Sequence, residues 1–146
     1  MGHDCVFCAI VAGGVPAHRV YEDELTIAFL NIHPAAPGHT LLIPREHAPQ
    51  LWHLSDAAAA GLGRSLRRVA GVVTTELEPD GMTVFQANGA AGWQSIFHVH
   101  FHLVPRMRED QLVPAWTETL ADPLGLDPMA ERLRAAFVRE REPLVE

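Results

Sequence analysis

The longest periodic run of apolar residues predicts a helix between Ser55 and Leu77. Its apolar positions recur at helical spacing and share one face: Leu62, Leu66, Val69, Ala70, Val73 and Leu77. Ser55 is a suitable N-cap, and the turn residues Pro79-Asp80-Gly81 end the pattern. A second helix is predicted from Pro128, with Asp127 as its N-cap and the proline at the favoured first position.

Shorter apolar runs, separated by turn residues, predict strands at five places along the chain. These runs cover residues 20–21, 26–31, 40–43, 82–87 and 96–104, and Pro105 ends the last one. Most of them follow one another in hairpin order. Two helices with about five such strands predict an α+β domain built on an antiparallel sheet, and no domain boundary is visible in the 146 residues.

Composition narrows the possible chemistry. With 48% hydrophobic and 20% charged residues, the chain has the composition of one folded domain and not of a disordered one. All 11 basic residues are arginine, which excludes lysine Schiff-base chemistry and the lysine of a phosphate-binding P-loop. The net charge of -7 argues against non-specific binding to nucleic acid. Nine histidines are the first indication of catalytic chemistry.

The two cysteines, Cys5 and Cys8, indicate metal or redox chemistry in a reducing compartment and cannot build a disulfide scaffold. The apolar stretch around them lacks the basic start of a signal peptide and is broken by Gly13 and Gly14. No stretch reaches the roughly 18–20 apolar residues that cross a bilayer. We therefore expect a soluble cytoplasmic protein that binds neither membrane nor nucleic acid.

The most informative segment is His98-Val99-His100-Phe101-His102-Leu103-Val104. Side chains alternate between the two faces of a strand, so the three histidines are expected on one face and the apolar residues between them on the other. An amphipathic strand can place one or two histidines on its polar face by chance. Three that fill every polar position, after the glycine-containing loop of residues 88–95, indicate a catalytic strip.

Histidine suits chemistry at phosphorus. An imidazole is largely neutral at pH 7, and its lone pair can attack phosphorus to form a covalent intermediate that water then hydrolyses. A second histidine can hydrogen-bond the phosphate or protonate the leaving group. Backbone N–H groups of the loop, with the Gln94 amide and the Ser95 hydroxyl, could hold phosphate oxygens. This scheme requires no catalytic metal.

The pattern His-x-His-x-His-x-x with apolar x resembles the signature of the histidine triad (HIT) superfamily of nucleotidyl hydrolases and transferases, and residues 98–104 match it throughout. Upstream segments resemble the Hint branch of that superfamily: residues 5–10, 15–17, 31–34 and 37–44. The resemblance implies one HIT domain over residues 1–146, with its core at 5–106 and an irregular segment and C-terminal helix at 107–146. It also implies a five-stranded antiparallel sheet with two main helices, in a homodimer whose sheet continues across the subunits.

The same resemblance implies roles for individual residues. His100 would be the nucleophile on the α-phosphate, His102 would contact the phosphate and leaving group, and His39 would support them, beside His98 of the triad. Asn31 would hold the ribose hydroxyls. Phosphate binding or orientation of the leaving group would fall to Asn88, Gln94 and Ser95. Five apolar positions match the walls of a purine pocket, with ordinary core packing as the alternative: Val6, Phe7, Ile10, Phe29 and Ile32.

A structural zinc site is implied as well. Many bacterial members of the family hold zinc with two amino-terminal cysteines, a loop histidine and the first triad histidine, and these positions are Cys5, Cys8, His47 and His98 here. Four such ligands make a closed tetrahedral site; free buried cysteines are the alternative. Zinc would tie the N-terminal segment to the catalytic strand and would not act as a Lewis acid.

We therefore predict an enzyme that cleaves purine nucleoside phosphoramidates or related adenylyl compounds through a nucleotidyl-histidine and releases AMP. One alternative is a nucleotide-binding interaction protein of the same fold with little turnover. Another is a metal-dependent His-x-His oxygenase in a β-barrel, against which the long helix argues. The sequence leaves open the leaving group, the choice between adenine and guanine, and the role of Trp116. Trp93 stands where many relatives have a small residue, and it could narrow the leaving-group side.

Overall fold

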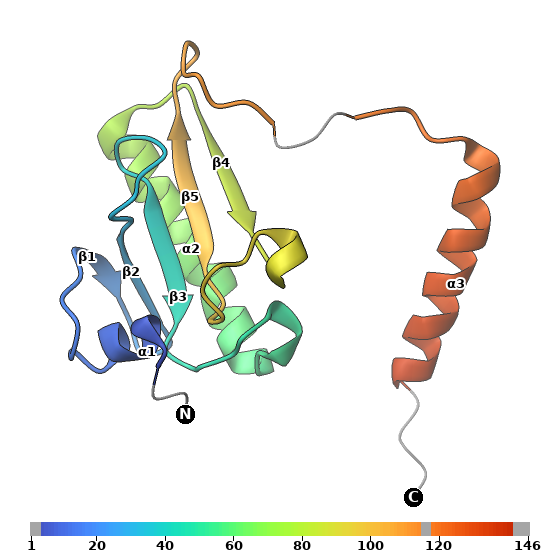
Figure 1. Cartoon of the computed structure of the whole chain (residues 1–146), viewed down its shortest axis with the longest axis horizontal. Helices are drawn as coiled ribbons and strands as arrows, with labels where there is room; N and C mark the ends of the chain where they lie inside the picture. Colours follow the sequence, from blue (N-terminus) through green and yellow to red (C-terminus); the bar gives the residue numbers. More distant parts are fainter. Residues whose placement is uncertain (1–3, 115–117, 142–146) are drawn as a thin grey trace, which may run out of the picture. The chain divides into compact units, whose positions relative to one another are not determined.

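The computed structural model describes residues 4–114 and 118–141 (Figure 1). The chain divides into two compact units, residues 1–112 and 113–146. The strands are β1 (Arg19–Glu22), β2 (Thr26–Leu30), β3 (Thr40–Pro44), β4 (Gly81–Gln86) and β5 (Phe101–Arg106). The α-helices are α1 (Val6–Val11), α2 (Asp56–Leu77) and α3 (Pro123–Arg141), and short 3₁₀ helices are η1 (Leu51–His53) and η2 (Ala90–Gly92). In this part of the chain, no helix is long and apolar enough to span a membrane.

The five strands form one antiparallel sheet in the order β1-β2-β3-β5-β4 (Figure 1). This arrangement confirms the predicted α+β class with a five-stranded antiparallel sheet. Strand β5 lies between β3 and β4, so His102 is opposite Leu41 on one side and opposite Phe85 on the other. The strand that carries the last triad histidine is therefore held on both sides by backbone hydrogen bonds.

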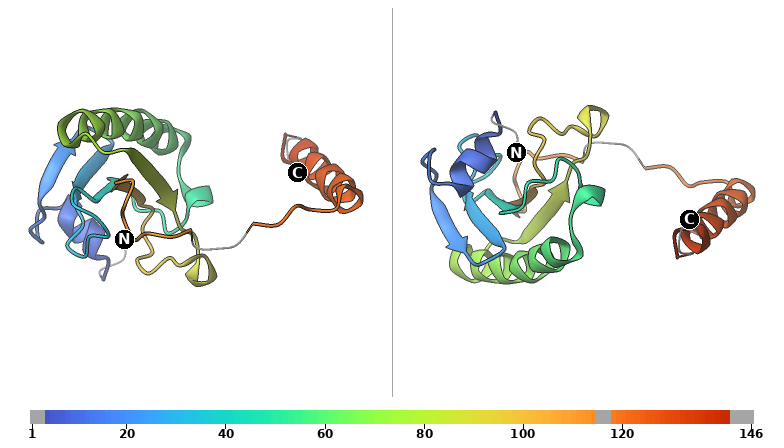
Figure 2. Two further views of the ribbon diagram at one scale, coloured as in Figure 1. Left: turned by 90° about the horizontal axis from the view of Figure 1, so that it is seen from above. Right: turned by 90° about the horizontal axis from the view of Figure 1, so that it is seen from below.

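Helix α2 covers one face of the sheet (Figure 2). It begins as predicted at Ser55, whose hydroxyl accepts a hydrogen bond from the Ala58 N–H at 3.2 Å. Leu62 and Val69 of α2 are buried in one cluster with Ala28, Leu42, Ala48, Val99 and Leu103. Leu77 was predicted on the same face but is 45% exposed, because the chain leaves the helix directly after it through Glu78 in a left-handed conformation.

The other face of the sheet packs against α1. This second cluster of buried residues comprises Phe7, Ile10, Ile27, Phe29, Leu41 and Ile43. The short helix α1 was not predicted from the sequence. Its N-cap is Cys5, whose sulfur accepts the Cys8 N–H at 3.4 Å in place of the usual oxygen.

The last strand differs from its prediction at both ends. It was predicted over residues 96–104 but begins at Phe101, because the preceding backbone is held elsewhere: the Val99 N–H donates to the Ala48 carbonyl at 2.8 Å. It also continues through Pro105 to Arg106. Pairing of β5 with β3 ends at Leu103, and only β4 pairs with it beyond that point. Pro105 therefore occupies an edge position, where a missing N–H is tolerated.

Helix α3 of the second unit begins earlier than predicted. The sequence suggested Asp127 and Pro128 as its start, whereas the helix begins at Pro123, and the Asp122 carboxylate accepts the Leu124 N–H at 3.0 Å. The same Asp-Pro signature occurs twice, and the first copy is the one that caps the helix. Trp116, whose role was left open, lies outside the described residues.

Candidate active site and metal-ligand cluster

The segment around the triad alternates between the two faces of the sheet. Val99 and Leu103 are fully buried against α2, with Phe101 partly buried beside them. The histidines lie on the opposite side, where the rings of His100 and His102 are 5.0 Å apart between centroids. Only His102 belongs to the strand itself, because β5 begins after His100.

The environment of His100 determines which of its nitrogens carries the proton. Its Nδ1 lies 2.7 Å from the carbonyl oxygen of His98. A carbonyl only accepts, so Nδ1–H donates and Nε2 of the neutral ring keeps its lone pair. The ring is 5% exposed and packs edge-on against Phe7 at 5.2 Å. Burial lowers the pKa of His100, which favours this neutral form.

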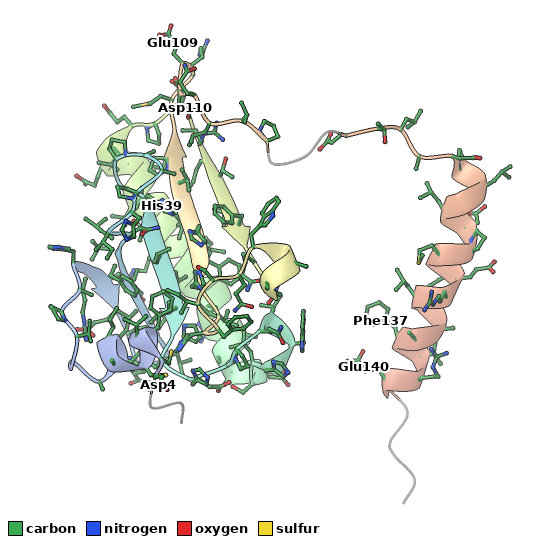
Figure 3. The ribbon with its side chains drawn as sticks, in the orientation of Figure 1. Asp4, His39, Glu109, Asp110, Phe137 and Glu140 are labelled. Carbon is green, nitrogen blue, oxygen red and sulfur yellow. The ribbon has the colours of Figure 1, made fainter. Side chains whose placement is uncertain are left out.

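A second fixed tautomer follows from the pair His39 and His102. The Ala35 N–H donates to Nδ1 of His39 at 3.0 Å, so the proton of neutral His39 is on Nε2. That Nε2–H donates to Nδ1 of His102 at 2.9 Å, which leaves His102 with its own proton on Nε2. Burial, with His100 and His39 nearby, lowers the pKa of His102 to about 4. Figure 3 shows His39 at the start of β3.

The loop after β4 is shaped by two of the predicted phosphate-binding side chains. Gln94 is 4% exposed; its amide oxygen accepts the Gly89 N–H at 2.7 Å, and its NH₂ donates to the carbonyls of Pro49 and Ile96. The amide oxygen of Asn88 accepts the Leu51 N–H at 2.8 Å. Both amides therefore hold backbone in place. Ser95, the third predicted residue, is exposed.

The predicted nucleoside-binding residues divide into buried and exposed positions. Phe7, Ile10 and Phe29 are about 95% buried in the cluster beneath α1 and are part of the core. Val6 and Ile32 are 41% and 76% exposed. The side-chain oxygen of Asn31 accepts the His33 N–H, and its nitrogen lies 3.5 Å from Nε2 of His39. Of the predicted nucleoside contacts, Asn31 lies beside His39, and Phe7 lies beside His100 with 5.2 Å between the ring centroids.

Cys5, Cys8, His47 and His98 come together as a possible metal-ligand cluster. One donor atom from each lies within 4.8 Å of all the others. Nε2–H of His98 donates to the Pro44 carbonyl at 2.9 Å, so Nδ1 has its lone pair free to face the cluster. The donor set is that of a structural zinc site.

The spacing of the donors matches a tetrahedron around zinc. Bonds of about 2.3 Å to sulfur and about 2.0–2.1 Å to nitrogen imply edges of about 3.3 Å between nitrogens and about 3.6 Å between nitrogen and sulfur. The two Nδ1 atoms of His47 and His98 are 3.3 Å apart. Nδ1 of His98 lies 3.5 Å from the Cys5 sulfur and 3.6 Å from the Cys8 sulfur. The Cys8 sulfur lies somewhat closer, 3.2 Å, to Nδ1 of His47, so the donors approach the geometry of a tetrahedral zinc site.

Trp93 has an unusual backbone. Its φ of 69° lies in the left-handed region, which glycine adopts with the least strain. This conformation gives a physical reason why a small residue suits the position. The Trp93 side chain is 63% exposed, on the loop that the Gln94 amide holds.

Sequence reasoning missed Phe85, whose ring lies directly on the ring of His102. The available signal was the strand pattern of residues 82–87, which places Phe85 on one of two faces but does not say which residue of β5 is opposite it.

The chain belongs to the HIT family. The family model described as HIT domain matches residues 12–109. The adenosine 5'-monophosphoramidase hnt1 of Schizosaccharomyces pombe is 39% identical over 106 residues, which cover 73% of this chain and 77% of that protein. The five-stranded α+β fold and the family match contradict the alternative of a His-x-His oxygenase in a β-barrel.

Two solved structures resemble the chain over most of its length. A HIT-family protein of Bacillus subtilis has a TM-score of 0.86 and 32% identity, and the match covers 91% of this chain and 96% of that one. A zinc-bound histidine triad family protein of Mycobacterium smegmatis has a TM-score of 0.70 and 36% identity, over 91% of this chain and 97% of that one.

The buried neutral histidines predict that the metal-free protein loses stability as the solution is acidified. The pKa of His102 falls from 6.5 to about 4 on folding, so the unfolded chain binds more protons between these values, and stability is lost as pH falls from about 6.5 to about 4. We expect the free energy of unfolding to decrease by about 2 kcal/mol from His102 over this range. Urea unfolding of chelator-treated protein at several pH values measures this loss.

A His102→Gln variant is expected to show a shallower pH dependence than the wild type. The matched control is His18→Gln, since His18 is exposed on the loop before β1. Equal slopes for the wild type and His102→Gln would contradict the assignment of a neutral, buried His102.

Proposed function

We propose that the protein is a nucleotidyl hydrolase that cleaves purine nucleoside phosphoramidates, or related adenylyl compounds, at the α-phosphate and releases AMP. The observation that carries the proposal is the pair of opposite tautomers: a free lone pair on Nε2 of His100 and a proton on Nε2 of His102. One nitrogen can attack and the other can donate. The named activity of the Schizosaccharomyces pombe relative supports the same reaction class.

The reaction would proceed in two steps. In the first, Nε2 of His100 forms a bond to phosphorus while the bond from phosphorus to the leaving nitrogen breaks, and Nε2–H of His102 donates a proton to that nitrogen. In the second, water adds to phosphorus and gives a proton back to Nε2 of His102, the bond to His100 breaks, and AMP is released with both imidazoles restored. The carbonyl of His98 accepts Nδ1–H of His100 at 2.7 Å and stabilises the positive charge that forms on the ring.

The remaining predicted residues would hold the substrate around these two histidines. We propose that Ser95 and backbone N–H groups of its loop bind phosphate oxygens, while Gln94 and Asn88 keep that loop in shape. His39 orients His102 and donates to it. Asn31 would bind the ribose hydroxyls. The purine would lie on the apolar residues near α1, where Val6 and Ile32 are accessible.

The test is AMP release from an adenosine phosphoramidate, without added divalent metal, by wild type and variants. His100→Ala is expected to lower the rate at least about 10³-fold because it removes the nucleophile, and His102→Ala by about 10²–10⁴-fold because it removes the proton donor. Intact-mass measurement during turnover should detect adenylated wild-type protein and none for His100→Ala.

His18→Ala is the matched control, an exposed histidine that should leave the rate unchanged. Turnover retained by His100→Ala would refute the covalent mechanism. Tight binding of AMP with no release from any substrate of a panel would instead favour a nucleotide-binding interaction protein.

We further propose that Cys5, Cys8, His47 and His98 hold a structural zinc ion. The fit of the donor distances and the zinc-bound relative of Mycobacterium smegmatis support this assignment. Bound there, zinc would supply a rigid cross-link between α1, the loop after β3 and the segment before β5. Its thiolate ligands require the reducing compartment that was expected from the sequence.

Purified protein is expected to contain about one zinc ion per chain by metal analysis. Binding should stabilise the folded state by about 3–4 kcal/mol when free zinc exceeds its Kd several hundred-fold, so chelation should lower the melting temperature and added zinc should restore it. Cys8→Ser should abolish both the metal content and the effect of the chelator, whereas the exposed His53→Gln should change neither. A Cys8→Ser protein with full zinc content would contradict the site.

We also propose that the protein is a homodimer, as its family resemblance implies. Two observations support this. Strand β4 ends the sheet and has a free edge within the described residues. Helix α3 has an apolar stripe of half-exposed or more exposed residues: Leu126, Met129, Leu133 and Phe137, the last labelled in Figure 3. Sedimentation equilibrium should give twice the mass of the chain; a monomer at micromolar concentration would contradict the proposal.

A further inference from the structure

Phe85 of β4 lies flat against a triad histidine. Its ring is parallel to the ring of His102, with 6° between the planes and 4.2 Å between the centroids. The two residues are directly opposite each other in the β4–β5 pair, so the contact follows from the register of the strands. No motif in the sequence singles Phe85 out.

We propose that Phe85 is a positioning residue for His102, whose imidazole it holds in the plane from which Nε2–H points to the leaving group. The inference rests on the proposed function and extends it, because it adds a residue that need touch neither phosphate nor nucleoside.

Apart from this stack, a hydrogen bond at Nδ1 holds the ring of His102. Its Nδ1 accepts from Nε2 of His39 at 2.9 Å, and a single hydrogen bond still allows the ring to tilt about the Cβ–Cγ bond. The ring of His100 lies at 57° to it and 5.0 Å away, too oblique to define a plane. The parallel ring of Phe85 does define one, because any tilt of the imidazole meets its face. The hydrogen bond and the stack together determine the direction of Nε2–H.

The exposure of Phe85 also argues for a role beyond core packing. Phe85 is 43% exposed, although burying the whole ring would contribute the most hydrophobic free energy to folding. It covers one face of His102 and so keeps water from that face. The titratable groups that face His102 are His39 and His100, and Phe85 adds none. Removing Phe85 should therefore act through hydration and mobility of the imidazole.

Four variants test the proposal. Phe85→Ala removes the stack, Phe85→Leu keeps apolar bulk without a flat face, and Phe85→Tyr keeps the flat face. Val84→Ala is the matched control: the neighbouring residue of β4 is 41% exposed but lies opposite Leu103 and not opposite a histidine. Sedimentation and thermal melting of each variant establish that it is folded and has the same assembly state as the wild type.

Two measurements, of kcat and of the His102 titration, detect the effect of these substitutions. Phe85→Ala and Phe85→Leu should lower kcat for AMP release by about 10–100-fold with little change in KM, while Phe85→Tyr and Val84→Ala should stay close to wild type. NMR titration of the His102 ring protons should show its midpoint moving from about 4 towards 6.5 in Phe85→Ala and Phe85→Leu, since water then reaches the ring.

Phe85→Leu with wild-type kcat and an unchanged His102 titration would overturn the proposal. An equal loss in Val84→Ala would also overturn it, since a general weakening of β4 would then explain both. The NMR titration needs no substrate, so it decides the role of Phe85 separately. A wild-type protein that releases no AMP would refute the proposed function and leave the titration result standing.

Discussion

His98 makes three interactions at once, and the arrangement of the whole site depends on them. Its Nε2–H donates to the carbonyl of Pro44 at the end of β3, its Nδ1 faces the sulfurs of Cys5 and Cys8, and its own carbonyl accepts Nδ1–H of His100. One residue thus connects the sheet, the metal-ligand cluster and the proposed nucleophile. Displacing the cluster would move the carbonyl that determines the tautomer of His100, even though no ligand atom belongs to His100.

Burial supplies the second requirement of the chemistry, a set of imidazoles that stay neutral. His39 and His100 are each 5% exposed, and a charged ring at either position would lose most of its hydration. Neutral rings still have two tautomers, and backbone groups choose between them. The N–H of Ala35 can only donate and the carbonyl of His98 can only accept. Nδ1 of His39 is therefore kept without a proton, and Nδ1 of His100 is kept protonated. The backbone thereby gives each of these two histidines one tautomer before any substrate binds.

Sequence reasoning succeeded where a local pattern has only one physical solution. The cap at Ser55, the five strands, and the grouping of Cys5 with His98 are all found in the structure. It failed where two local solutions compete, as with the repeated Asp-Pro signature that starts α3. It also did not reveal that the amides of Asn88 and Gln94, which were predicted to contact the substrate, bond backbone groups of Leu51 and Pro49. Those partners are distant in sequence, so no local pattern reveals them.

The register between β4 and β5 determines which residues of the alternating sequence pattern lie beside the histidines. Alternation in β4 says that Phe85 and Val84 point to opposite faces, and a slip of one residue would place Val84 on the histidine side. The register is held at the far end of the hairpin. Gly81 is opposite Arg106 there, the Arg108 N–H donates to Asp80 at 2.8 Å, and Arg106 donates to the hydroxyl of Thr83 at 3.0 Å. Contacts at the open end of the β4–β5 pair, remote from the histidines, thus help to fix which side chain lies on His102.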